Sequence, residues 1–308
     1  MSKYQYEARP KVRVISDNDY AGDPDGLVQL AHLLLSKTAD VKAVVSSHLR
    51  RDVPWPVPEL PSTAGAILAK QVAEFCHSNA PVFAGAETGM QNLQTPTDSD
   101  AVDFLIQEAL DDSSGLPLLV LCGGSLTTIA SAYLKEPRIA EKVKLILIGG
   151  PGYQEANTAE PEFNFTADLF AAQIIFNQSD IELVQVPRTT YAQTKVSRVE
   201  LVDRMANVNA LGAFIWDKYL DVETFATTIG INFGEIFVLG DSPLVLISCL
   251  QSALDGDGSW VAADQTSFAV DASGRYDRTK PGRTIRVYHT IDNRLMVEDF
   301  FGKLARLR

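Results

Sequence analysis

Residues 11–30, KVRVISDNDYAGDPDGLVQL, decide the fold. Apolar and β-branched residues from Val12 to Ile15 are typical of a buried strand, and a run rich in carboxylates follows them. Apolar residues then recur at helical spacing, at Leu27, Leu30, Ala31 and Leu34. The stretch therefore predicts a strand, an acidic loop and a helix in succession.

The predicted loop carries four carboxylates within nine residues, Asp17, Asp19, Asp23 and Asp25. Carboxylates held close together raise one another's pKa, so a fold that gathers them needs hydrogen-bond donors or a cation. Asp and Asn offer hard oxygen ligands, and no set of Cys and His residues lies beside them, which favours Ca²⁺ or Mg²⁺ over zinc. The loop thus predicts a site for a hard cation.

The loop could also be a solvated turn or an EF-hand. Asp, Asn, Gly and Pro are common turn residues, so the acids could be solvated, with Asp23 or Asp25 capping the next helix. An EF-hand would need a ligand at the fifth position and a Glu at the twelfth. Counted from Asp17, these places hold Ala21 and Val28, which excludes an EF-hand.

A third interpretation is a phosphatase of the Asp-x-Asp type. Asp17 would be the phosphorylated nucleophile and Asp19 the acid, although Tyr20 stands where that pattern has Thr or Val. The later pair Gly240-Asp241 supports this alternative, because such enzymes also use a late Gly-Asp.

The composition of the 308 residues is that of an ordinary globular protein, with 46% hydrophobic and 21% charged residues. A net charge of −12 argues against sequence-independent binding of nucleic acid, which depends on Lys and Arg. The chain shows neither the apolar core of a signal peptide nor about 18 consecutive apolar residues, so we expect a cytoplasmic protein with no membrane partner. Three separated cysteines, Cys76, Cys122 and Cys249, predict reduced thiols.

Polar residues also follow other predicted strands. His48 comes just after the strand 41–46, and Gly123-Gly124 follows the strand 118–122. The carboxyl ends of parallel strands form the ligand crevice of an α/β sheet, so His48 would face the same rim as the acidic loop; the alternative is a surface histidine. The glycine pair lets the backbone approach a phosphate closely or offer a carbonyl to a cation.

The segment 149–166 follows the strand 143–148 and is rich in amides and acids. Asn157, Glu162 and Asn164 lie in it among aromatic residues, and these are the donors and acceptors that a polyol or sugar requires. Asp241 stands between a strand-like run and a predicted helix, where an isolated Asp is typically an N-cap.

The remaining pattern predicts alternating strands and helices. Further helices are expected at 63–77, 101–110, from about 126, and at 167–176, 197–206, 214–225 and 297–304. Further strands are expected at 80–85, 181–186 and 284–289, and a proline-rich loop at 53–61. We therefore predict one α/β domain, 1–308, with a mostly parallel central sheet flanked by helices and with strand and helix additions at the C-terminus. Trp216 and Tyr219 are expected in the core or in a contact between copies of the chain, so a homo-oligomer is left open.

Taken together, these motifs resemble the inosine-uridine-type nucleoside hydrolases. DNDYAGDPDG is similar to the family's DTDPGxDD, CGGSLTT to its TGPLTN, and Glu162-Phe163-Asn164 to its EFN. VPRTTYAQTKV is similar to its VPLDVT, and Gly240-Asp241-Ser242-Pro243 to its late Asp-Pro. The similarities run in order across residues 10–305, and they imply the nucleoside hydrolase fold and a small riboside or sugar as the substrate.

The resemblance also implies roles for individual residues. Ca²⁺ would be bound by Asp19, Asp25, the main-chain carbonyl of Gly123, and Asp241. Asp19 would in addition be the general base for the water on the ion. The sugar would be bound by Asp23, His48, Asn157, Glu162 and Asn164, and Asp17 would support the loop from behind.

Two departures from the family's pattern bear on these roles. Pro24 separates the last two acids of the loop, so Asp25 reaches the ion only if the loop bulges by one residue. Gly240 stands where the family commonly has a His that protonates the leaving base, so His48, Glu59 or Tyr219 would have to replace it. The departures leave two alternatives open: a hydrolase of other glycosides, and a sugar-binding protein without turnover.

Overall fold

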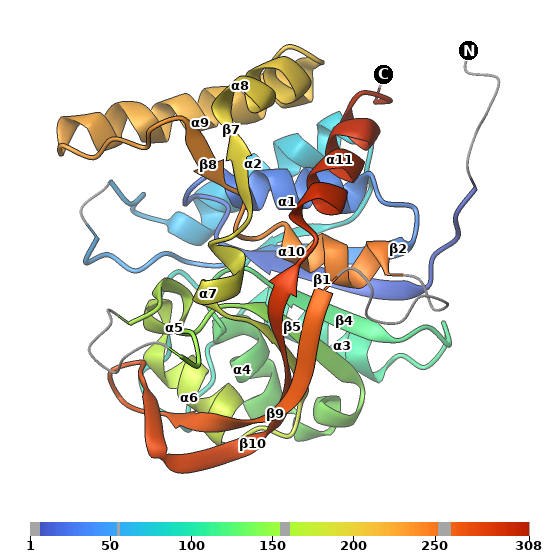
Figure 1. Cartoon of the computed structure of the whole chain (residues 1–308). Coiled ribbons are helices and arrows are strands. Elements are labelled where there is room, and N and C mark those ends of the chain that lie inside the picture. The colour runs from blue at the N-terminus through green and yellow to red at the C-terminus, as the bar shows by residue number, and fades with distance from the viewer. Residues whose placement is uncertain (1–6, 54–55, 155–160, 252–259, 308) are drawn as a thin grey trace.

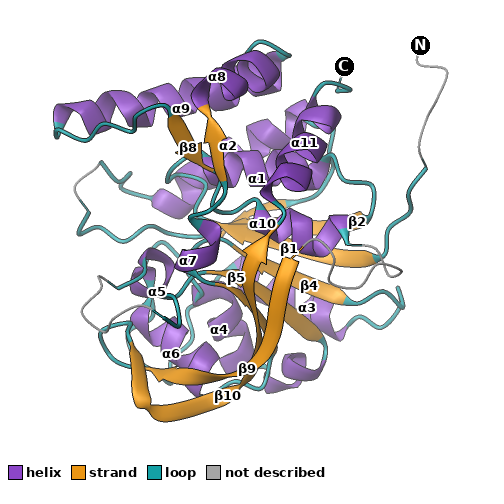
Figure 2. Ribbon diagram, viewed as in Figure 1, coloured by secondary structure: helices purple, strands orange, loops and turns teal. Residues whose placement is uncertain are grey.

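The computed structural model describes residues 7–53, 56–154, 161–251 and 260–307. In these residues a sheet of eight strands has the order β3-β2-β1-β4-β5-β6-β10-β9, with helices on both of its faces (Figures 1 and 2). Neighbouring strands are parallel except for β9, which pairs with β10 in the antiparallel sense. The prediction of a mostly parallel sheet is therefore confirmed.

The main sheet consists of β1 (Val12–Asn18), β2 (Ala39–Ser46), β3 (Val82–Ala84), β4 (Leu118–Cys122), β5 (Val143–Ile148), β6 (Glu182–Val186), β9 (Trp260–Val270) and β10 (Tyr276–Ile291). A separate pair is formed by β7 (Lys195–Ser197) and β8 (Ile236–Val238). The helices are α1 (Asp25–Leu34), α2 (Pro61–Phe75), α3 (Asp100–Leu110), α4 (Thr127–Lys135), α5 (Phe163–Ala167), α6 (Leu169–Asn177), α7 (Arg188–Tyr191), α8 (Arg198–Leu201), α9 (Ala210–Thr228), α10 (Pro243–Val245) and α11 (Asn293–Leu304). None of the described helices is long and apolar enough to cross a membrane.

Alternation along the strands explains why helices cover both faces of the sheet. Ile15 of β1 belongs to the apolar cluster shared with α3, α4 and α6, whereas its neighbour Val14 belongs to the cluster shared with α1 and α10. Successive side chains of a strand point to opposite faces, so each strand contributes to both clusters. In Figure 1, α3, α4 and α6 accordingly lie on one side of the sheet, and α1, α2, α10 and α11 on the other.

The structure differs from the predicted elements in several details. Pro61 begins α2 instead of ending the loop, because the first turn of a helix does not need the missing N–H. The cap of α3 is Ser99, whose hydroxyl accepts a hydrogen bond from the Val102 amide. The strand β9 was not predicted, and β8 lies outside the main sheet. Tyr219 is buried and stacks on Trp216, with ring centres 4.9 Å apart, as expected for core residues.

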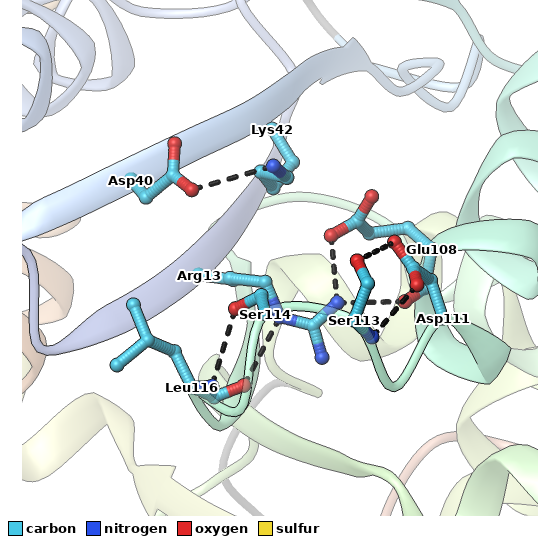
Figure 3. Close-up of polar contacts among 8 residues, drawn as sticks. All are labelled: Arg13, Asp40, Lys42, Glu108, Asp111, Ser113, Ser114 and Leu116. Carbon is cyan, nitrogen blue, oxygen red and sulfur yellow. Dashed lines mark hydrogen bonds and ion pairs between the residues drawn. The ribbon is translucent and has the colours of Figure 1, made fainter.

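A buried arginine holds the amino end of β1 against the connection from α3 to β4 (Figure 3). Arg13 Nη1 donates to the carboxylate of Glu108 at 2.8 Å and to its carbonyl at 2.9 Å, and Nε donates to the Leu116 carbonyl at 3.0 Å. The charged side chains are almost inaccessible, at 7% exposure for Arg13 and 11% for Glu108. This end of the sheet lies opposite the edge that carries the acidic loop.

Glu108→Ala should therefore lower the free energy of unfolding by about 3 kcal/mol, because it leaves the buried guanidinium without its counter-charge. Urea unfolding followed by circular dichroism measures the change. Asp112→Ala is the matched control. It removes the exposed ion pair with Lys142 and should cost less than about 1 kcal/mol. Equal losses of unfolding free energy in the two variants would show that the buried Arg13–Glu108 pair stabilises the fold no more than an exposed ion pair does.

Candidate active site

The glycine turn after β4 lies directly on the acidic loop after β1. The Gly123 amide donates to the Asp17 carbonyl at 2.9 Å, which continues the pairing of the two strands. A Cβ on Gly123 would lie 2.5 Å from Asn18 Nδ2, and one on Gly124 would lie 2.8 Å from the Asp19 amide nitrogen. Only glycine allows so close an approach, and the approach packs the glycine turn against Asn18 and Asp19.

Acids from the start of the chain and from near residue 241 meet at this edge, as predicted. The Asp241 amide donates to Asp25 Oδ2 at 3.1 Å, and Asn18 Nδ2 donates to Asp241 Oδ2 at 3.0 Å. Pro24 is buried and precedes the first residue of α1, which is Asp25. It is therefore Asp25, and not residue 24, that turns toward Asp241.

Burial first, and then mutual repulsion, raise the pKa values of the clustered carboxylates. Burial raises the pKa of Asp19 well above its usual range, and the charges of Asp241 and Asp23 raise it further. Burial likewise raises the pKa of Asp25 well above its usual range, and that of Asp241 to about 8. A bound cation would lower these pKa values, because its positive charge stabilises the ionised carboxylates.

Asp17 lies behind this cluster, within β1 itself. Burial raises its pKa to about 7, against the smaller opposing effect of the Thr128 and Ser47 hydroxyls. The residue is 1% exposed, and neither carboxylate oxygen makes a well-formed hydrogen bond to a described residue. Asp17 is therefore closed off from any ligand of substrate size.

The chemistry of the cluster fits a hard divalent cation. Across the described parts of the chain, no three His, Cys, Asp or Glu side chains already form a complete set of metal ligands. The donors near Asp19 are carboxylates and the Gly123 carbonyl, which also accepts a hydrogen bond from Asn164 Nδ2 at 2.9 Å. Such oxygen donors suit Ca²⁺ or Mg²⁺, and one main-chain carbonyl among carboxylates is usual for Ca²⁺.

Glu162 and Asn164 lie beside the glycine turn, as expected of residues that share a site with it. Asn164 joins two strand ends, because its Nδ2 donates both to the Gly123 carbonyl and to the Ile148 carbonyl. Glu162 caps α5, and its Oε2 accepts hydrogen bonds from the Gly150 and Phe165 amides at 2.8 and 3.1 Å. Asn157, the third predicted sugar ligand in this segment, lies outside the described residues.

Asp23 and His48, the other two residues expected to bind the sugar, both make hydrogen bonds within the protein. Asp23 is exposed, and its Oδ1 accepts from the Asp25 amide at 3.2 Å, in an Asx turn that opens α1. His48 is 3% exposed, which rules out a surface histidine. Its ring nitrogens lie 3.2 Å from the Ala167 carbonyl and 3.4 Å from the Ser125 hydroxyl, and burial lowers its pKa.

Tyr191 is a residue of the site that the sequence analysis missed. Its hydroxyl donates to Glu162 Oε1 at 2.9 Å, and its ring lies against Gly240, next to Asp241. Tyr191 could have been found from its position just beyond the strand 181–186, because His48 and Gly123 were also named for following predicted strands. Of the residues named from the sequence as replacements for the family's His, Tyr219 is buried in the core and Glu59 is exposed.

The parallel sheet with acids, amides and a glycine turn at its carboxyl edge defines an α/β protein with a ligand site at the ends of its strands. Residues 14–297 match the family model for inosine-uridine preferring nucleoside hydrolases, and the chain belongs to this family.

Known relatives agree with this membership. The chain is 38% identical over 101 residues to the inosine-uridine preferring nucleoside hydrolase of Crithidia fasciculata, a match that covers 30% of this chain and only 32% of that protein. It is 25% identical over 224 residues to the pyrimidine-specific ribonucleoside hydrolase RihB of Shigella flexneri serotype 5b (strain 8401), covering 65% of this chain and 68% of the relative. The structure of a purine-preferring ribonucleoside hydrolase from Gardnerella vaginalis superposes with a TM-score of 0.73 over 96% of this chain and 98% of that one; at 18% identity this similarity shows the fold.

Gly124→Ala should lower the free energy of unfolding by about 2 kcal/mol, because the new methyl group would lie 2.8 Å from a main-chain nitrogen that cannot move away freely. Thermal unfolding measures the effect. Gly302→Ala is the control, since a Cβ there meets no heavy atom within 4 Å in α11, and alanine should stabilise that helix by up to about 1 kcal/mol. If Gly124→Ala were as well tolerated, the glycine turn would not be in close contact with the acidic loop.

Proposed function

We propose that the protein is a Ca²⁺-dependent hydrolase of N-ribosidic or related glycosidic bonds, with Asp19 as its general base. The observation that carries the proposal is the meeting of Asp25 and Asp241 beside Asp19 at the carboxyl edge of the sheet. Membership of the nucleoside hydrolase family supports the choice of N-ribosides.

The ion would be held by Asp19, Asp25 and Asp241 and by the Gly123 carbonyl. When bound, Ca²⁺ supplies a positive charge that orients the attacking water and makes it more acidic. Asp19 would accept the proton of that water, which a carboxylate beside the ion can do. Asn18 keeps Asp241 in place through its amide.

The sugar would be bound on the side of the site formed by Glu162 and Asn164, together with Asp23, His48 and Asn157. As the bond from the anomeric carbon to the leaving group breaks, its electron pair goes to the leaving group and positive charge develops on the sugar ring. The negative charge of Glu162 would stabilise that transition state. A ribosidic substrate is therefore consistent with the charges of the site.

The phosphatase alternative is not supported by the position of Asp17. A nucleophile must reach its substrate, and Asp17 is 1% exposed and forms part of a strand paired on both sides. A sugar-binding protein without turnover differs from the hydrolase only in lacking the chemical step, so kinetic measurements separate the two.

Asp19→Asn should lower kcat for hydrolysis of inosine, uridine or p-nitrophenyl β-D-ribofuranoside by about 10²–10⁴-fold in saturating Ca²⁺, because the amide cannot accept the proton. Release of base or of p-nitrophenol measures the rate. The exposed Asp112→Asn is the control and should retain full activity. Binding of ribose without hydrolysis by the unmodified protein would contradict the proposal, as would phosphatase activity that is lost on Asp17→Asn.

Addition of Ca²⁺ to EDTA-treated protein should raise Tm, because an ion that binds only the folded state stabilises it by about 2.7 kcal/mol at one hundred times Kd. Differential scanning fluorimetry measures the shift. In Asp241→Asn the shift should disappear or shrink strongly, whereas in Asp112→Asn it should persist. An unchanged shift in Asp241→Asn would mean that calcium binds elsewhere.

A further inference from the structure

We propose that the Tyr191 hydroxyl, oriented by the Glu162 carboxylate, binds one hydroxyl of the sugar: Tyr191 donates a hydrogen bond to Glu162 and accepts a hydrogen bond from the sugar hydroxyl. The inference rests on the proposed function, and it adds a binding residue for which the family resemblance implied no role. Three observations support it: the position of the Tyr191 ring, the hydrogen bonds of Glu162, and the exposure of the two side chains.

The position of the Tyr191 ring places it between the two parts of the site. A Cβ on Gly240 would lie 3.4 and 4.0 Å from ring atoms Cδ2 and Cε2 of Tyr191, and 3.1 Å from Asp25 Oδ2. The other end of the side chain, its hydroxyl, lies 2.9 Å from Glu162 Oε1. Tyr191 thus extends from the carboxylates proposed to hold the ion to the carboxylate proposed to hold the sugar.

The backbone around Tyr191 is well fixed. Its amide donates to the Pro187 carbonyl at 3.0 Å, and its carbonyl accepts from the Thr194 hydroxyl at 2.6 Å. The adjacent Thr190 hydroxyl donates to the Tyr288 carbonyl of β10 at 2.7 Å, which ties α7 to the main sheet. A side chain on so firmly held a turn can present its oxygen at a defined place.

The protein's own hydrogen bonds occupy both acceptor places of Glu162 Oε2 and one of the two on Oε1. Each carboxylate oxygen can accept about two hydrogen bonds. Among the described residues, Oε2 already accepts from Gly150 and Phe165, and Oε1 accepts from Tyr191. In these contacts Tyr191 is the donor, so its own oxygen keeps acceptor capacity at 2.9 Å from the carboxylate.

Exposure also favours Tyr191 as the member of the pair that meets the ligand. Glu162 is 1% exposed, whereas Tyr191 is only half-buried. Burial, and then the charge of Glu162, raise the pKa of the Tyr191 hydroxyl, so it keeps its proton at neutral pH. The negative charge of Glu162 also polarises the tyrosine O–H and makes its oxygen a better acceptor.

The test is Tyr191→Phe, which keeps the ring against Gly240 and removes only the hydroxyl. The substrate is the best riboside of the unmodified protein, compared with its 2′-, 3′- and 5′-deoxy analogues. We expect kcat/KM for the parent riboside to fall about 10-fold, as for the loss of one hydrogen bond to a polarised group. For the one analogue that lacks the bound hydroxyl, the variant and the unmodified protein should have equal kcat/KM.

The control is Tyr133→Phe, which removes a tyrosine hydroxyl bonded to the Gln178 carbonyl, away from the site, and should change neither value. Equal losses on the parent and on every analogue would assign Tyr191 a purely structural role and overturn the inference, as would no loss on any of them. Either result with an active unmodified protein leaves the proposed function standing. If the unmodified protein hydrolyses no riboside, the proposed function fails and the inference fails with it.

Discussion

The site depends on the hydrogen bonds that join Asn18, Asp25 and Asp241. Carboxylates gathered away from water repel one another, and the raised pKa values of Asp25 and Asp241 show that burial is costly here. The Asn18 amide and the Asp241 main-chain N–H are the donors that offset this cost, and each also fixes an orientation. These two hydrogen bonds attach the acidic loop to the segment around residue 241.

The rest of the site is arranged around that junction by the ends of the strands. The glycine turn packs against Asn18 and Asp19, and Asn164 binds the Gly123 carbonyl and the end of β5 with one amide group. Glu162 lies on the far side and is linked back to the junction through Tyr191. Tyr191 therefore connects the carboxylates of the junction with the carboxylate of Glu162.

The sequence predicted those parts of the molecule that depend on local pattern. The bounds of β4 and β5 follow directly from short apolar runs, and the rule that ligands bind at strand ends located Asp19, Gly123 and Glu162. Local pattern was insufficient where tertiary contacts decide: taken alone, Asp241 indicated a helix cap, and only the family resemblance placed it with the early acids, while Tyr191 was overlooked. The strand β9 has no signal of its own either, because it exists by pairing with β10.

The residues that form the junction lie far apart along the chain, which delays their meeting during biosynthesis. Asn18 and Asp241 are 223 positions apart, and Asp25 and Asp241 are 216. While the ribosome is still adding the middle of the chain, the early acids have no partner to meet, and contacts of such separation form slowly even in a finished chain. In a nascent chain the early acids therefore stay in water, and the junction that buries them can form only after the last quarter of the protein has begun to appear.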